Sequence, residues 1–397
     1  MRNISELPRR DSSPNLQLKR SKLRSKSQQP PPSYSRLSET KESESLVPVG
    51  VFLGGSCNPT KWRKDICIPL LQAASISYYD PQVDEWYEEL IQVEERAKGE
   101  AQMLFIVIDN VTRSIVSLHE AIESIFVGRT IVLVVQFLNF GIKVEGEMLS
   151  EEEVDDHNGA RRRLQALAHR MEIPLYDDVH DAVQYRLRRR SSITLHKWSS
   201  RVMRLAGDQR TRSKSLSCAQ FPGKWSLNRL ETSQVIQQFA QCRYQSQESV
   251  YLGGVLIGTT WRQIVPLLED AGIPFFIRYE DYLSHQLQQK ESQFQWKPLR
   301  SSPSMQLVLF VISGNSRSIA AMAEAVELIY SDNALILVME CLREREKLEG
   351  GSILCGREFK DLVRARAYLR EMAVRQGIHI FGSVREAVES IVRCREA

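Results

Sequence analysis

Long apolar runs, paired cysteines and a leader-like start are all missing from this chain of 397 residues. Its longest apolar stretches, such as 103–108 and 131–135, are much shorter than the roughly 18 residues that a membrane-spanning helix needs, so we expect no membrane span. The opening residues, MRNISELPRR, lack the apolar core of a secretory signal. The seven cysteines are odd in number, scattered, and without CxxC spacing. We therefore expect no disulfide scaffold, no metal site and a cytoplasmic location, with the nucleus as a second compartment.

Basic residues are concentrated in two segments of the chain. Residues 1–48 carry 10 Lys and Arg against 5 Asp and Glu, and residues 184–248 carry 13 against 3, which leaves a net charge of −11 on the remainder. In both segments the basic residues alternate with serine instead of aromatic residues. This pattern is typical of a solvated, flexible segment and argues against a nucleic-acid partner.

Both basic segments contain short recognition patterns. Pro31-Pro32-Ser33-Tyr34 is a PPxY motif, which suits the aromatic groove of a WW domain, although such a match also arises by chance in a Pro-rich tail. In the second segment, arginines precede three serines at the spacing that basophilic kinases favour: Ser191, Ser192 and Ser215. Their phosphorylation would cancel positive charge and recruit phosphoserine-binding proteins.

The chain contains one unit twice. VFLGGSCNPTKWRKDICIPLL at 51–71 aligns with VYLGGVLIGTTWRQIVPLL at 250–268, and IDNVTRSIVSLHEAIESI at 108–125 aligns with ISGNSRSIAAMAEAVELI at 312–329. A fixed order of matching segments is the signature of an internal repeat. We predict a tail at 1–48, a first lobe at 49–185, a linker at 186–248 and a diverged second lobe at 249–397.

Each lobe alternates short apolar runs with amphipathic stretches, which predicts an α/β fold with a parallel sheet of the flavodoxin or Rossmann type. The expected strands of the first lobe are 50–53, 76–79, 103–108, 131–135 and 174–176. The expected helices lie near 61–74, 83–98, 114–127, 159–171 and 179–188.

Ligands of open parallel sheets bind beyond the carboxyl ends of the strands. The polar and glycine residues that follow the first three strands are Gly54, Gly55, Ser56, Asn58, Asp80, Asp84, Asp109 and Asn110. The double glycine lets a ligand approach the backbone, but the loop is not GxGxxG and lacks the lysine of a P-loop. We therefore expect no dinucleotide or other cofactor, and a tight strand-to-helix turn remains the simpler explanation of the glycines.

GGSCNPTKWRKDICIPLL, SYYDPQVDEW and FIVIDNVTRSIVSLHEA together resemble the nucleoside 2-deoxyribosyltransferase-like family over most of the first lobe. The resemblance implies a nucleoside or nucleotide ligand and Glu120 as the nucleophile that traps an oxocarbenium-like sugar. It further implies Glu94 and Asp109 as supporting carboxylates, with Arg113 of the IDNxTR motif at the ligand.

Two departures weaken the catalytic interpretation. Residues 116–119 before Glu120 contain no glycine, whereas active members of the family often have one in that turn. In the second lobe, Ser313 and Gly314 replace Asp109 and Asn110, although Glu324 remains. The whole-chain layout also resembles the animal Raw family, whose members restrain JNK-type MAP kinase signalling. We therefore expect a non-catalytic signalling regulator or adaptor, with an active deoxyribosyltransferase or nucleotide N-glycosidase as the alternative.

Overall fold

The computed structural model describes residues 49–83, 90–188, 250–254, 258–276, 307–331, 333–348 and 350–396. We call the described residues of 49–188 the first lobe and those of 250–396 the second lobe. Both belong to one compact unit that begins at Pro48. Among the described helices, none has the length and apolar character needed to cross a bilayer.

The first lobe is built on a five-stranded parallel sheet with the order β2-β1-β3-β4-β7. Its strands are β1 (Val51–Gly55), β2 (Tyr78–Tyr79), β3 (Met103–Ile108), β4 (Ile131–Val135) and β7 (Leu175–Tyr176). Its helical elements are the π-helix η1 (Arg63–Cys67), α1 (Ile68–Ala73), α2 (Leu90–Glu100), α3 (Ile115–Phe126), α4 (Glu151–Arg170) and α5 (Val179–Arg188). The predicted α/β class and the parallel sheet are confirmed.

The second lobe has a parallel sheet of the same topology, with the order β9-β8-β10-β11-β12. Its strands are β8 (Val250–Gly254), β9 (Phe275–Phe276), β10 (Leu307–Ile312), β11 (Ala334–Met339) and β12 (Ile380–Phe381). Its described helices are α8 (Gly258–Asp270), α10 (Ile319–Ile329), α11 (Gly356–Arg375) and α12 (Val384–Glu396). In each sheet the first strand of the lobe pairs with the second and the third, which is the flavodoxin order.

Strands β3 and β4 are apolar and buried along their whole length because helices cover both faces of the sheet. Alternate side chains of β3 enter two different hydrophobic clusters. Phe105 and Val107 pack with η1, α1 and α5, whereas Leu104 and Ile106 pack with α3 and α4. The sheet therefore separates two hydrophobic layers, one with η1, α1 and α5 and the other with α3 and α4.

Helix α4 is longer than the sequence predicted. The expected helix began at 159, but the helix starts at Glu151, because the side chain of Ser150 accepts a hydrogen bond from the backbone N–H of Glu153. This Ser-x-x-Glu pattern is a helix-capping signal. A short antiparallel hairpin of β5 (Lys143–Val144) and β6 (Glu147–Met148) precedes it and was not predicted.

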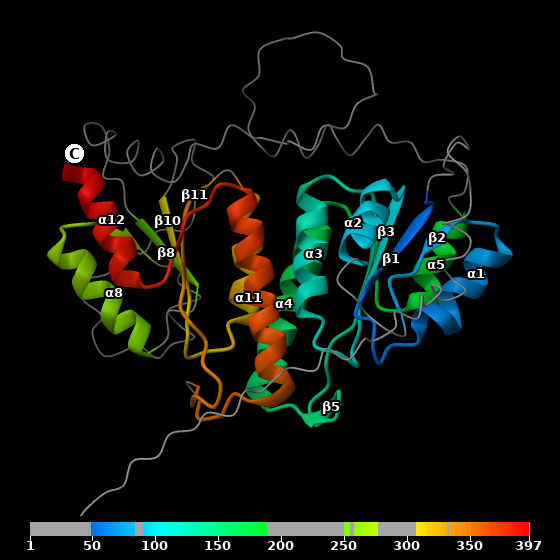
Figure 1. The fold of residues 1–397 in the computed structure, drawn as a ribbon, viewed down its shortest axis with the longest axis horizontal. Coiled ribbons are helices and arrows are strands. Elements are labelled where there is room, and N and C mark those ends of the chain that lie inside the picture. The colour runs from blue at the N-terminus through cyan, green and yellow to red at the C-terminus, as the bar shows by residue number, and fades with distance from the viewer. Residues whose placement is uncertain are drawn as a thin grey trace, which may run out of the picture. The chain divides into compact units, whose positions relative to one another are not determined.

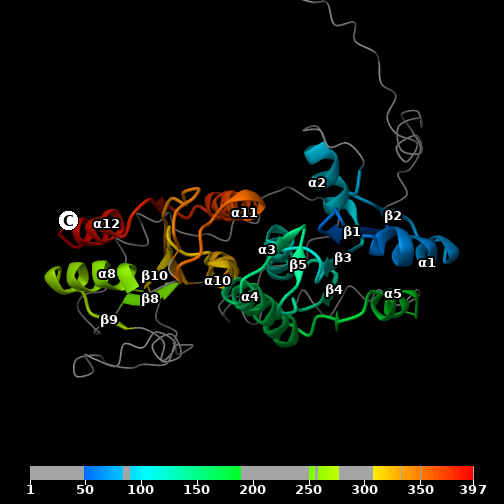
Figure 2. The same ribbon diagram turned by 90° about the horizontal axis from the view of Figure 1, so that it is seen from below.

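The two lobes meet through four helices. Figures 1 and 2 show α3, α4, α10 and α11 between the two sheets, and these helices share one hydrophobic cluster drawn from both lobes. The carboxylate of Asp156 on α4 caps the start of α10, accepting from the N–H groups of Ile319 at 2.9 Å and Ala320 at 2.8 Å. A capping carboxylate also complements the positive end of the helix dipole.

The ion pairs between the two lobes occur at equivalent positions of the repeat, as expected when two copies of one unit pack around a two-fold axis. Arg170 on α4 binds Glu327 on α10, and the equivalent Arg375 on α11 binds Glu123 on α3. Within the lobes, the pair of Arg113 with Glu153 corresponds to that of Arg317 with Glu358. The repeated sequence thus produces a repeated set of contacts across the lobes.

Candidate functional site

The turn after β1 is built by glycine and by a buried arginine. Gly55 has a φ of +126°, and a Cβ there would lie 2.5 Å from the carbonyl oxygen of Val107. The fully buried Arg63 donates to the carbonyl oxygens of Leu53 at 3.0 Å, Gly55 at 2.7 Å and Ser56 at 2.8 Å. The glycine therefore serves a close backbone approach between β1 and β3, and the turn's carbonyl groups are already occupied by protein.

Asp80 and Asn58 lie next to this turn and are linked by Gln82. The carboxylate of Asp80 is 3.6 Å from the guanidinium of Arg63 and accepts the backbone N–H of Gln82. The amide of Gln82 donates to the side chain of Asn58 at 3.1 Å. Burial raises the pKa of Asp80, while the Gln82 N–H and Arg63 oppose that rise. Asp84, the other expected acid of this loop, lies outside the described residues.

The predicted nucleophile Glu120 forms an ion pair. Its carboxylate lies 2.7 Å from the ammonium group of Lys98 on α2, and the two side chains are 22% and 27% exposed. Burial alone would lower the pKa of Lys98, but the neighbouring Glu120 carboxylate outweighs it, so that this pKa is raised. Lys98 also lies 5.6 Å from the ring centroid of Phe52. Sequence reasoning did not single out Lys98.

Glu94 lies beside this pair, one turn before Lys98 on α2. Burial raises the pKa of Glu94, Lys98 opposes the rise, and Glu120 adds to it. Burial raises the pKa of the Cys57 thiol, Arg63 opposes the rise, and the charges of Glu94 and Glu120 add to it. Of the two glutamates expected at the site, Glu120 is thus ion-paired with Lys98, and Glu94 lies close enough for its pKa to respond to both charges.

The second lobe contributes a side chain to the surroundings of Glu120. Tyr368 on α11 is 38% exposed. Burial raises the pKa of its phenol, and the charge of Glu120 raises it further. A residue so distant in sequence could be placed here only by the packing of the two lobes.

Asp109 is buried and closes its own loop. Its carboxylate accepts from the backbone N–H groups of Val111 at 2.9 Å and Thr112 at 2.7 Å, and both of its oxygens accept from the Thr112 hydroxyl. With these donors in place, the carboxylate stabilises the turn that leads into α3. No hydrogen bond or ion pair joins it to Glu120 or Glu94 in the described part of the chain.

Asn110 opens onto a different feature, a cavity of about 210 Å³ at the carboxyl edge of β3. The cavity lies on the side of the sheet covered by η1 and α5, away from α2. It is lined by Thr60, Lys61, Trp62, Ile66, Val107, Asp109, Asn110, Val111, Gln136, Asp178 and Val179. The sequence predicted one ligand site, but the described structure divides the expected residues between this cavity and the Glu120 group.

Arg113 is engaged away from the expected site. The guanidinium is 3% exposed and binds Glu153 at 2.8 Å and Glu147 at 2.9 Å, with Asp361 of the second lobe at 3.8 Å. The expectation that Arg113 contacts a ligand beside Glu120 therefore has no support in this geometry, because its donors face the lobe contact. The motif arginine instead ties the start of α3 to α4 and α11.

The matching glutamate of the second lobe is also ion-paired. Glu324 binds Arg163 on α4 of the first lobe. Arg163 also binds Glu327 at 3.1 Å, so this glutamate is part of the lobe contact. Both glutamates at the position of the nucleophile are therefore matched with a cation.

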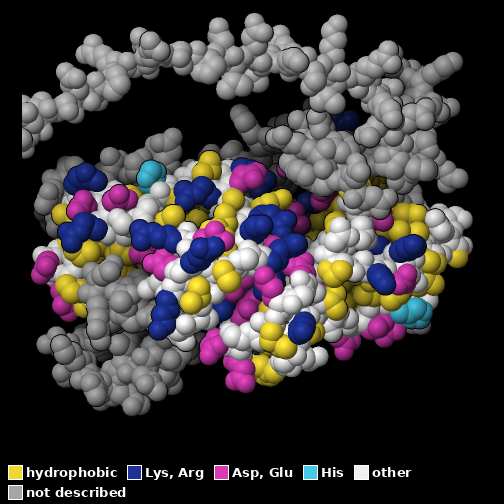
Figure 3. Space-filling model, turned by 60° about the horizontal axis from the view of Figure 1, so that its bottom comes forward, with side chains coloured by type: hydrophobic (Ala, Val, Ile, Leu, Met, Phe, Trp, Pro, Cys, Tyr) yellow, Lys and Arg dark blue, Asp and Glu magenta, His cyan; other side chains and the backbone are white. Residues whose placement is uncertain are grey.

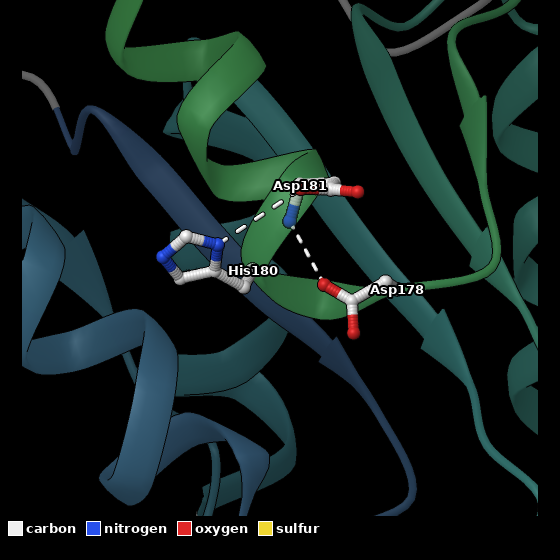
Figure 4. Close-up of side chains that lie close together, drawn as sticks. All are labelled: Asp178, His180 and Asp181. Carbon is white, nitrogen blue, oxygen red and sulfur yellow. Dashed lines mark hydrogen bonds and ion pairs between the residues drawn. The ribbon is translucent and has the colours of Figure 1, made fainter.

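Asp178, His180 and Asp181 form the one group of potential metal ligands in the described ranges (Figure 4). The backbone N–H of Asp181 donates to the Asp178 carboxylate at 3.0 Å, and the imidazole of His180 lies 3.9 Å from the Asp181 carboxylate. All three side chains are exposed. Their hydrogen bonds are those of the cap of α5, which accounts for the cluster without a metal.

The surface charge does not favour nucleic acid on the side seen in Figure 3. There, Lys and Arg side chains of the described residues lie among Asp and Glu side chains and form no broad basic area. A nucleic-acid interface usually presents a basic stripe or patch.

Residues 48–137 match a family model described as nucleoside 2-deoxyribosyltransferase like. The match includes the loop after β1, Glu94, Asp109 and Glu120. The first lobe therefore contains a nucleoside 2-deoxyribosyltransferase-like domain, as the sequence motifs predicted. No curated protein and no solved structure matches the chain.

The arrangement around Glu120 can be tested by measuring the pKa of Glu94 in two variants, in which it should shift in opposite directions. Since Lys98 lowers and Glu120 raises the pKa of Glu94, we expect Lys98→Met to raise it further and Glu120→Gln to lower it. The measurement is a pH titration of the Glu side-chain carboxyl carbons by NMR in the full-length protein. Lys64→Met, at an exposed position on η1, is the control and should leave the pKa of Glu94 unchanged. Shifts of the same sign in the two variants would contradict the cluster.

Proposed function

We propose that this protein is a signalling regulator or adaptor whose nucleoside 2-deoxyribosyltransferase-like domain does not turn over substrate. The observation that carries the proposal is the 2.7 Å ion pair of Lys98 with Glu120. A carboxylate that accepts a charge-assisted hydrogen bond from an ammonium group is a poorer nucleophile. The ion pair must therefore open before Glu120 can attack a sugar. The glutamate at the equivalent position of the second lobe, Glu324, is also ion-paired, with Arg163 on α4, which supports a structural role for this position.

The state of Asp109 supports the same conclusion. Cleavage of an N-glycosidic bond needs a second group that protonates or orients the departing base. The Asp109 carboxylate accepts several hydrogen bonds within its own loop, so it has little capacity left for a base. The absence of glycine from residues 116–119, which precede Glu120, also supports a domain without turnover. A nucleoside or nucleotide can still be a ligand of such a domain.

The regulatory part of the proposal rests on the sequence. The PPxY motif with Pro31, Pro32 and Tyr34 and the serines at 191, 192 and 215 lie outside the described residues. We propose that they bind WW-domain and phosphoserine-binding proteins, in the cytoplasm and also in the nucleus. The resemblance of the layout to the Raw family further suggests that the protein restrains JNK-type signalling.

Expression of the full-length protein in stimulated cells should lower the level of phosphorylated JNK. Tyr34→Ala, and separately the triple Ser→Ala variant at 191, 192 and 215, should weaken this effect, because each removes one recognition pattern without touching a lobe. Tyr185→Phe, in the first lobe, is the matched control and should behave as wild type. Unchanged phosphorylation of JNK in cells that express the wild-type protein would refute this regulatory role.

The second candidate function is an active deoxyribosyltransferase or nucleotide N-glycosidase. One observation favours it: Glu94, with its raised pKa, lies near the ionised Glu120 pair, as an acid lies near a nucleophile in a retaining glycosidase. In this interpretation Lys98 would release Glu120 when substrate binds.

Incubation of the full-length protein with a panel of deoxynucleosides and their 5′-monophosphates separates the two functions. The proposal predicts that release of free base by the wild type does not exceed that by Glu120→Gln. Loss of a nucleophile usually costs several orders of magnitude in rate. Base release that is abolished by Glu120→Gln and retained in Glu95→Gln would replace the proposed function with the enzymatic one.

A further inference from the structure

The cavity at the carboxyl edge of β3 is small and has apolar walls. Its volume of about 210 Å³ equals the room of about seven water molecules at roughly 30 Å³ each. The Trp62 ring, which is 8% exposed, forms one wall, and its centroid lies 4.3 Å from the guanidinium of Arg63. The other apolar side chains of the lining are Ile66, Val107, Val111 and Val179. Such a cavity suits one small molecule with an apolar part.

Two side chains of opposite charge also line the cavity. Lys61 lies just before η1 and Asp178 just before α5, and both are exposed, so they lie where the cavity meets solvent. Within the described ranges neither of them forms an ion pair. One oxygen of the Asp178 carboxylate accepts the backbone N–H of Asp181, and the other oxygen points away from it in Figure 4. A ligand that carries both charges would find a charge-assisted partner for each.

Two amides supply neutral hydrogen-bonding groups at the same cavity. Asn110 is half-buried, and its side chain has no hydrogen-bond partner in the described part of the chain. The amide nitrogen of Gln136 donates to the carbonyl oxygen of Asp177 at 3.0 Å, which leaves the amide oxygen as an acceptor. The carboxylate of Asp109, by contrast, is occupied by donors of its own loop. The unused polar groups of the cavity are therefore one cation, one anion and two amides.

At the equivalent place, the second lobe has no room for an amide side chain. Gly314 corresponds to Asn110, and a Cβ there would lie 2.6 Å from the carbonyl oxygen of Cys341. The N–H of Gly314 donates at 2.9 Å to the carboxylate of Glu340, which corresponds to Gln136. The loop after β10 thus lies against the end of β11, whereas the amides of Asn110 and Gln136 are not bonded to each other. The fold therefore does not require the space that the first lobe leaves open.

The two charges differ between the lobes as well. Thr260 and Ser383 correspond to Lys61 and Asp178. Cation and anion therefore occur together in the lobe whose loop leaves the amides free, and both are replaced by neutral residues in the other lobe. A ligand that uses both charges accounts for this joint difference more simply than two unrelated surface positions.

We propose that this cavity binds one free amino acid with an apolar side chain of the size of leucine or phenylalanine. Lys61 binds the α-carboxylate, Asp178 binds the α-ammonium group, and the apolar side chain packs on Trp62. The amides of Asn110 and Gln136 complete the hydrogen bonds of the two charged groups. The site does not include Glu120, so the proposal is independent of the function proposed above.

Analogues that lack one charge test this recognition in the full-length wild-type protein. The ligands are phenylalanine, phenethylamine, which has no carboxylate, and 3-phenylpropionate, which has no ammonium group. A ligand-observed NMR titration gives the Kd of each, and a ligand of this size should bind with a Kd of about 1 mM or lower. Loss of either charge should raise the Kd about tenfold, because it removes a charge-assisted hydrogen bond.

Two variants with matched controls assign each charge to its partner. Lys61→Met should bind phenylalanine no better than phenethylamine, and Asp178→Asn should bind phenylalanine no better than 3-phenylpropionate. Asparagine also caps helices, so the second variant keeps the start of α5. Lys64→Met and Asp177→Asn, at exposed positions outside the lining, should keep both preferences of the wild type.

Three results would overturn the proposal. The first is the absence of saturable binding of phenylalanine and leucine at concentrations up to about 10 mM. The second is an equal Kd for the three ligands in the wild type, which would mean that only the apolar part is recognised. The third is the persistence of both preferences in Lys61→Met and Asp178→Asn, which would place the bound amino acid elsewhere on the protein.

Discussion

The packing of α3 and α4 against α10 and α11 is the constraint on which the rest of the structure depends. It joins the cores of the two lobes into one hydrophobic cluster. Around that cluster, carboxylates and guanidinium groups pair across the contact, as in the binding of Glu327 by Arg170 and of Glu123 by Arg375. Because each lobe covers the apolar helix face of the other, the contact resembles an isologous dimer interface closed within a single chain.

This contact also fixes the chemistry available to the two glutamates of α3 and α10. Glu324 is tied to Arg163 on α4 across the contact, whereas the corresponding position on α11 of the second lobe, near Glu120, is Tyr368. A tyrosine does not neutralise a carboxylate, and in the first lobe Lys98 from α2 supplies that charge instead. The glutamates at the two equivalent positions, Glu120 and Glu324, are thus neutralised by cations from different helices. This is expected of a carboxylate that stabilises the fold and unexpected of a nucleophile.

Much of the fold could be predicted from the sequence, because apolar runs such as 103–108 and the aligned repeats determine strands, helices and their order. The start of α4 was not predicted, although the sequence contains its capping pattern in Ser150 and Glu153. Lys98 could also have been found, since it lies four residues after Glu94 on one helix face. The position of Tyr368 near Glu120 and the ion pairs of Arg113 could not be predicted, because both depend on how the lobes pack. The hydrogen bonds of Asp109 within its own loop could not be predicted either, because an aspartate at a strand end serves a turn as readily as a ligand.

The most direct test of the central claim is the free energy of unfolding of Glu120→Gln in the full-length protein, compared with Glu95→Gln, an exposed site on α2. If Glu120 is a structural partner of Lys98, its substitution removes a charge-assisted hydrogen bond and should cost about 1 kcal/mol, while the control changes little. A catalytic carboxylate is often held at the expense of stability, and its removal then stabilises the fold. A gain in stability from Glu120→Gln would contradict the account.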